Sequence, residues 1–126
     1  MSPNRQVLGR TGSSFSVGLK VSGGSMVFVS GLLPMDGQGK LVADDMAGQT
    51  RHIFETMSEL MVEAGGTLAN VVRLTAYMTT LVDYQAYAKL RAEFFAGALP
   101  ASAVVQVAGL LLPGALLEVD AYGMLP

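Results

Sequence analysis

Two carboxylates stand two positions apart near the C-terminal end of the chain, at Glu118 and Asp120. Alternate residues of a strand point to the same side, so both share a face with Leu116 and Tyr122. A carboxylate among apolar neighbours needs a partner or a role. One role is to orient a water molecule and handle its protons, which makes Glu118 the first candidate for a catalytic residue. The other interpretation is an ion pair between subunits with Arg73, and the sequence leaves both open.

Few other side chains suggest a catalytic or metal-binding role. We expect Asp120 to be structural or solvated. The only histidine, His52, has no serine or aspartate in the spacing of a hydrolytic triad. With one histidine and no cysteine, the chain has no disulfide and offers no usual metal site, and we expect no cofactor. Arg91 falls in a predicted helix, where an exposed, solvated arginine is the commoner case.

The composition indicates one ordered domain that covers residues 1–126. Hydrophobic residues make up 51% of the chain, charged residues 14%, and the mean hydropathy is +0.44, which excludes disorder. The net charge is -2 and no run of lysine or arginine occurs, so a nucleic-acid partner is not expected.

No segment suits a membrane or an export signal. The most apolar stretch, Gly109–Leu117, is short and is interrupted by Pro113 and Gly114. The first residues lack the apolar core of a signal peptide, so we expect a cytoplasmic protein. So few charges cannot cover the surface of a small domain, which predicts a homo-oligomer.

Periodicity and turn residues predict five strands and two helices, in the order β-β-α-β-α-β-β. Asp44 or Asp45 can cap the first helix and Gly65-Gly66 can end it. This order predicts an α+β sandwich with a mixed sheet and both helices on one face. The expected strands are Val17–Ser22, Met26–Ser30, Val71–Thr79, Ser102–Ala108 and Ala115–Tyr122, and the helices run from Asp44 or Asp45 to about Ala64 and from Asp83 to about Gly97.

The two faces of the later strands differ in character. One face of Val71–Thr79 is wholly apolar and must lie under the helices; it consists of Val72, Leu74, Ala76 and Met78. The opposite face mixes apolar, aromatic and polar groups in both this strand and the last one. Such a face is typical of a sheet covered by partner subunits, and a solvated outer face is the alternative.

Seven stretches in the same order and spacing carry a family resemblance. They are VFVSG at 27–31, QTR at 49–51, AGGTLANVV at 64–72, EFF at 93–95, PA at 100–101, VQVA at 105–108 and LEVDA at 117–121. The chain resembles the RidA/YjgF family of imine deaminases from about Phe15 to Tyr122. The resemblance implies a chorismate-mutase-like fold and a homotrimer with a central barrel and small-molecule clefts between subunits. It also implies hydrolysis of reactive enamines and imines without a metal or organic cofactor.

The residues that line the family's cleft are retained in part. Ser30 and Gly31 match, and Glu118 stands where the family has its water-positioning glutamate. The family's substrate-binding arginine follows Pro-Ala, and here that position is Ser102. The resemblance places Phe15 where an aromatic, usually tyrosine, forms the cleft wall.

Two helix positions complete the set of candidate cleft residues. A helix asparagine of the family falls at Ala88, and the resemblance places an aromatic at Arg91. Arg91 could in principle resupply the missing cation. Because Ser102 is neutral, we expect a more apolar cleft that favours a less charged or aromatic ligand.

Two functions of different class follow. The first is a divergent hydrolase or deaminase of an imine, enamine or related C–N compound, with Glu118 orienting water. The second is a trimer that binds a small metabolite or acts as a regulatory scaffold without catalysis.

Overall fold

A computed structural model describes residues 4–11 and 14–126. It contains a six-stranded mixed sheet, two α-helices and one short 3₁₀ helix. The elements are β1 (Asn4–Thr11), β2 (Ser16–Ser22), β3 (Ser25–Leu32), α1 (Met46–Glu63), η1 (Leu68–Asn70), β4 (Val71–Met78), α2 (Tyr84–Phe94), β5 (Ala101–Gln106) and β6 (Leu117–Leu125).

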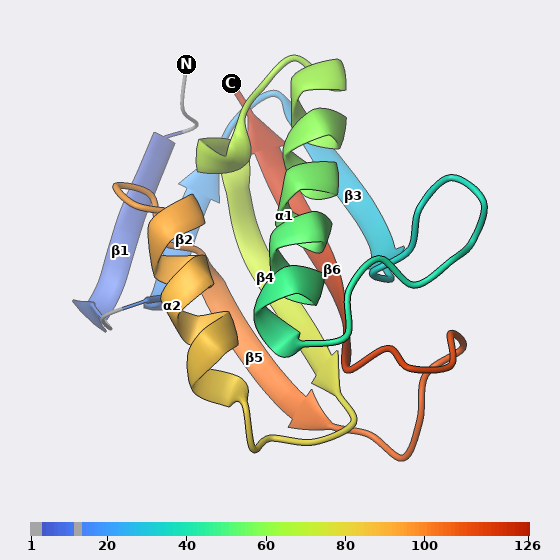
Figure 1. The fold of residues 1–126 in the computed structure, drawn as a ribbon. Coiled ribbons are helices and arrows are strands. Elements are labelled where there is room, and N and C mark those ends of the chain that lie inside the picture. The colour runs from blue at the N-terminus through green and yellow to red at the C-terminus, as the bar shows by residue number, and fades with distance from the viewer. Residues whose placement is uncertain (1–3, 12–13) are drawn as a thin grey trace.

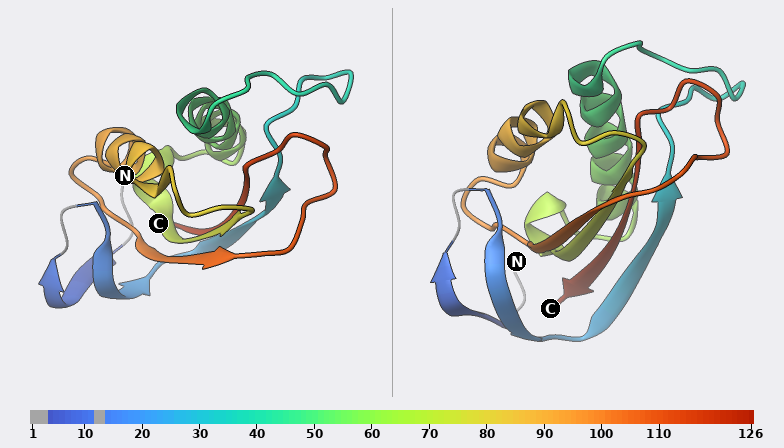
Figure 2. Two further views of the ribbon diagram at one scale, coloured as in Figure 1. Left: turned by 60° about the horizontal axis from the view of Figure 1, so that its bottom comes forward. Right: turned by 90° about the horizontal axis from the view of Figure 1, so that it is seen from below.

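The predicted two-layer α+β architecture is confirmed. The strand order is β1-β2-β5-β4-β6-β3; β5 runs parallel to β2 and β4, and the remaining neighbours are antiparallel. Both helices lie on the same side of the sheet (Figure 1). Figure 2 shows that no element covers the opposite side of the sheet in the described part of the chain.

Helix α1 forms where the sequence predicts it. The Asp45 carboxylate accepts a hydrogen bond from the Gly48 amide at 3.1 Å and so caps the first turn. Gly65 follows the last turn with a φ of +100°, a conformation that glycine adopts without steric cost. The helix buries one stripe against the sheet: Ile53, Phe54, Met57 and Met61 are each 0% exposed.

The core lies between this stripe and the apolar faces of β4 and β6. Leu74, Ala76 and Met78 of β4 are fully buried, as the alternation predicts. The prediction for Val72 is wrong. A register shift between β4 and β6 at residues 71–73 places Val71 in the core instead, and Val72 lines a pocket with Arg73 on the uncovered face.

Strand β1 and several element ends differ from the sequence prediction. The sequence gives no reason to expect β1, because Asn4–Thr11 is mostly polar and exposed. Helix α2 ends at Phe94 rather than near Gly97, and β6 extends to Leu125. No helix among the described residues has the length and apolar character needed to cross a membrane.

Arg5 attaches β1 to the rest of the domain. Its guanidinium donates to the carbonyl oxygens of Ala69 at 2.6 Å, Leu99 at 3.1 Å, Ala98 at 3.2 Å and Val71 at 3.3 Å. This contact fixes the loop that leads into β5 and therefore the start of the strand that carries Ser102.

Candidate functional site

The candidate residues form two groups on opposite faces of the sheet. Ser102 pairs with the fully buried Leu74 and therefore faces the helix layer. Glu118 pairs with Tyr77, between buried neighbours, and therefore faces the uncovered side. One chain alone does not bring these two residues together.

The first group is built around a β-bulge. Val29 pairs with Ala121 and Leu32 pairs with Val119, so β3 has one extra residue at the position of Ser30 and Gly31. Gly31 packs directly against Glu118, because a Cβ on it would collide with the Glu118 carboxylate and displace the end of that side chain. The structure therefore brings together the predicted residues Ser30, Gly31 and Glu118.

The Glu118 carboxylate is partly exposed and accepts no side-chain hydrogen bond within residues 4–11 and 14–126. Asp120 on the same face instead accepts a hydrogen bond from the Tyr77 hydroxyl at 3.0 Å. That bond raises the pKa of Tyr77 above its usual value. Arg73 pairs with Tyr122 rather than with the register position of Glu118, so within the chain Glu118 remains available to a ligand or water.

The second group centres on Arg91, and here the expectation of a solvated side chain is wrong. Arg91 is 1% exposed. Its Nη1 donates to the Ser102 hydroxyl at 2.8 Å, and its Nη2 donates to the hydroxyls of Ser14 at 2.7 Å and Tyr84 at 2.9 Å. Helix α2 turns the side chain inward because Arg91 lies on its sheet-facing side, one turn beyond the buried Ala88.

Three aromatic rings surround this guanidinium. The Arg91 Cζ atom lies 5.1 Å from the ring centroid of Tyr87, 5.2 Å from that of Phe15 and 5.8 Å from that of Tyr84. The guanidinium thus lies against the Phe15 ring as well as against the two tyrosine rings of α2. Burial raises the pKa of Tyr87 to about 12, although the positive charge of Arg91 acts in the opposite direction.

The cluster has no negative charge and contains unpaired polar atoms. Arg91 forms no ion pair with the described residues, and residues 1–3 and 12–13 include no aspartate or glutamate. Arg91 Nε and the Tyr87 hydroxyl are buried without a hydrogen-bond partner in the described part of the chain. Buried polar groups are normally paired, and a buried cation normally has a counter-charge.

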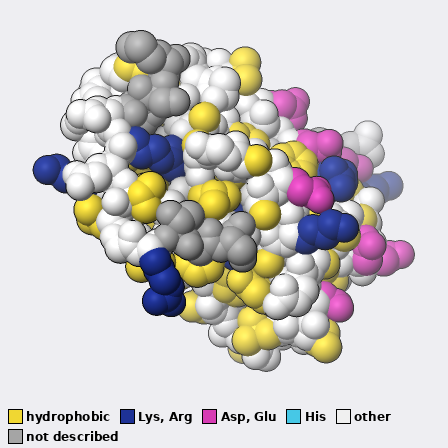
Figure 3. Space-filling view, turned by 90° about the vertical axis from the view of Figure 1, so that its left-hand side faces the viewer, with side chains coloured by type: hydrophobic (Ala, Val, Ile, Leu, Met, Phe, Trp, Pro, Cys, Tyr) yellow, Lys and Arg dark blue, Asp and Glu magenta, His cyan; other side chains and the backbone are white. Residues whose placement is uncertain are grey.

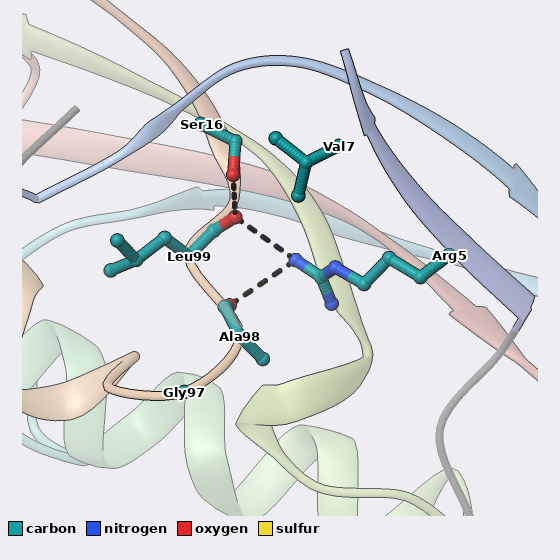
Figure 4. A pocket seen from close by; sticks show the side chains of 6 residues that line it. All are labelled: Arg5, Val7, Ser16, Gly97, Ala98 and Leu99. Atoms are coloured by element: carbon teal, nitrogen blue, oxygen red, sulfur yellow. Dashed lines mark hydrogen bonds between the residues drawn. The ribbon is translucent and has the colours of Figure 1, made fainter. Parts of the chain in front are cut away.

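A separate pocket of about 320 Å³ lies between β1 and the loop before β5. Arg5, Val7, Ser16 and residues 97–99 line it, and none of them is a predicted site residue (Figure 4). The Arg5 guanidinium points at the Ala98 and Leu99 carbonyl oxygens, and Ser16 donates to Leu99 at 2.6 Å. Because these groups satisfy one another, we assign this pocket a structural role.

Sequence reasoning missed the partners of Arg91. Tyr84, Tyr87 and Arg91 are spaced by three or four residues and share one side of α2, which is a signal that the sequence does contain. No signal indicates Ser14, because it reaches Arg91 only through the tertiary fold. No group of three or more metal-ligating side chains occurs among the described residues.

The chain is similar to known proteins over almost its whole length. Residues 11–124 match the family model described as endoribonuclease L-PSP. A curated relative, the 3-aminoacrylate deaminase RutC of Acinetobacter baylyi, is 40% identical over 96 residues, which are 75% of each chain. The structure of the Rid-family protein YyfB from Yersinia pestis superposes with a TM-score of 0.87 at 28% identity, covering 97% of this chain and 99% of that one.

A second solved structure also resembles this chain over almost its whole length. Rv2704 of Mycobacterium tuberculosis, described as a member of the YjgF/YER057c/UK114 family, is 27% identical. It covers 97% of this chain and 100% of its own, with a TM-score of 0.71.

Proposed function

This chain belongs to the endoribonuclease L-PSP family, which includes the RidA/YjgF proteins, and on that premise we propose that it is a hydrolytic deaminase of small enamines and imines. The single observation that supports the proposal best is the partly exposed Glu118 carboxylate, held against Gly31 without a side-chain partner in the described chain. A free carboxylate at a conformationally defined position is suited to orient a water molecule.

The reaction consumes one water and releases one ammonia. A 3-aminoacrylate-type enamine first accepts a proton at carbon and becomes the iminium ion. Water then adds to the C=N carbon, and the Glu118 carboxylate accepts the proton that the water gives up. The carbinolamine hydroxyl transfers its proton to the nitrogen, and the C–N bond breaks. Ammonia departs, and an aldehyde or ketone remains. Neither a metal nor an oxidant takes part in this sequence.

The distribution of the groups supports an assembly in which each cleft takes residues from two copies. Glu118 lies on the uncovered face with Ser30 and Gly31, whereas Arg91 and Ser102 lie under the helices. We propose a homotrimer whose sheets meet around a central barrel. Light scattering on the purified protein should then give a mass three times the 13.2 kDa of the chain.

A small-molecule substrate also agrees better than RNA with the charge of this chain. The net charge is -2. On the face shown in Figure 3, lysine and arginine side chains are dispersed and form no continuous strip. Binding to a nucleic-acid backbone depends on such clustered positive charge.

The proposed activity is tested with imines that an amino-acid oxidase generates from a panel of amino acids. Semicarbazide traps the imines, and a deaminase lowers the rate of semicarbazone formation. We expect the natural protein to lower it. If only the Ser102→Arg variant does so, the natural protein is not a deaminase, and the metabolite-binding trimer becomes the better description.

The β-bulge at Ser30 and Gly31 holds the Glu118 carboxylate in place, so a side chain at Gly31 should impair catalysis. In Gly31→Ala the new Cβ displaces the Glu118 carboxylate, and a displacement of about 1 Å can cost roughly 10²-fold in rate. We therefore expect kcat for imine hydrolysis to fall about 10²-fold while the melting temperature changes little, because the end of the Glu118 side chain can move.

Gly37→Ala is the matched control for this measurement. A Cβ on Gly37 meets nothing within 4 Å, and Gly37 does not have a positive φ. Equal loss of rate in both variants, or no loss in either, would contradict the role of Gly31.

A further inference from the structure

We infer that Arg91 binds the carboxylate group of the substrate from helix α2, in place of the arginine that the family carries on the strand at the position of Ser102. The inference rests on the proposed function for its substrate class, which it narrows to enamines and imines that carry a carboxylate. It also replaces the expectation of an apolar cleft.

Arg91 and Ser102 lie at the same place in the fold. The Ser102 hydroxyl lies 2.8 Å from Arg91 Nη1, so the guanidinium of α2 reaches the strand position directly. Serine is small and leaves room for that guanidinium beside β5. The Arg91 guanidinium on the helix therefore lies at the strand position that has lost its own cation.

The positive charge of Arg91 is unbalanced among the described residues. Arg91 is 1% exposed and its hydrogen-bond partners are three neutral hydroxyls, with no counter-charge among the described residues. A buried charge without a counter-charge is costly, so a sequence that keeps one gains something other than folding stability. A bound carboxylate supplies the missing charge.

Two buried polar groups of this cluster lack hydrogen-bond partners in the described chain. Arg91 Nε and the Tyr87 hydroxyl are both donors, both buried and both without a partner in the described chain. The Tyr87 ring lies beside the guanidinium, with its centroid 5.1 Å from Arg91 Cζ. A carboxylate is acceptor-only and has two oxygens, so it matches donors that lack acceptors.

The contacts in the ligand-free protein are of a kind that a carboxylate can displace. A guanidinium binds a carboxylate through charge-assisted bonds that are about twice as strong as bonds to neutral groups. The bonds from Arg91 to the hydroxyls of Ser102 and Tyr84 are only partly buried, whereas the bond to Ser14 is buried, so a ligand reaches the first two more readily.

Binding of propionate and of its neutral analogue propionamide to the intact protein tests the inference. The two probes have nearly the same shape and neither can be deaminated hydrolytically as an imine, so the result does not depend on catalysis. We expect propionate to bind roughly 10- to 100-fold more tightly, as a charged hydrogen-bond pair allows. In Arg91→Met this preference should disappear.

Arg51→Met is the matched control. Arg51 also lies over an aromatic ring, 5.8 Å from the Phe94 centroid, but it is exposed on helix α1. The Arg51→Met variant should keep the preference for propionate over propionamide. If Arg91→Met keeps the preference as well, the inference is overturned even where the protein proves to be a deaminase. If Arg91→Met loses it in a protein that deaminates nothing, the inference holds and the proposed function fails.

A double variant guards against a fold that does not tolerate Arg91→Met. Adding Ser102→Arg to Arg91→Met returns the cation to the strand, and we expect the preference for propionate to return. A folded double variant that still fails to distinguish the two probes would overturn the inference that both positions serve one carboxylate.

Discussion

The Glu118→Gln variant is expected to lose between about 10²- and 10⁴-fold in kcat for imine hydrolysis, the range that a positioned general base contributes. Glutamine keeps the size of the side chain and its contact with Gly31 but cannot accept the proton of the attacking water. The oligomer and the melting temperature should remain those of the natural protein. On the same preparations, semicarbazone trapping measures the rate, light scattering measures the oligomer and thermal unfolding measures the melting temperature.

Asp120→Asn provides the comparison on the same strand face. Asp120 accepts a hydrogen bond from Tyr77, and an asparagine oxygen can also accept it, so the rate should change little. The competing interpretation of Glu118 makes an opposite prediction. If Glu118 pairs across subunits with Arg73, its loss leaves an unpaired buried cation, which would cost about 3–5 kcal/mol of stability.

Phe54→Ala is expected to produce the largest loss of stability. Phe54 is 0% exposed, and its ring centroid lies 5.2 Å from that of Phe95, 5.4 Å from that of Phe94 and 5.7 Å from that of Tyr87. Truncation removes these contacts and leaves a cavity between α1 and α2, at a cost of about 3–5 kcal/mol. Urea denaturation followed by circular dichroism measures this cost.

Leu111→Ala serves as the control, because Leu111 is 91% exposed and its truncation should change stability by less than about 0.5 kcal/mol. Since Tyr87 also contacts Arg91, Phe54→Ala should weaken propionate binding as well. A Phe54→Ala protein as stable as the natural one would mean that the helices do not pack as described.

Much of the fold could be predicted because the relevant signals are local. The stripe of α1, its Asp45 cap and the alternation in β6 each follow from residues close in sequence. Strand β1 could not be predicted, because its residues show no apolar alternation and it is held by pairing with β2 and by Arg5. The position of Val71 in the core depends on a register shift, which the pattern of one strand does not reveal.

The same holds for the site: local features could be predicted from the sequence, and contacts between distant residues could not. The family resemblance gives Ser30, Gly31 and Glu118, and the structure places Gly31 against the Glu118 side chain. The environment of Arg91 could not be predicted, since it depends on Ser14 and Ser102, which lie 77 and 11 positions away. Without them, Arg91 has the features of an ordinary surface residue on a helix.

The contacts of Arg5 also bear on the order in which the chain acquires its structure during synthesis. The four carbonyl oxygens that it binds lie 64 to 94 positions further along. Strand β1 therefore leaves the ribosome before these partners, and it cannot attach fully until residue 99 has followed. Closing so long a loop is slow compared with forming local contacts, so β1 is among the last strands to dock. A chain arrested within α2 would lack the Ala98 and Leu99 contacts and would expose the edge of β2 to other chains.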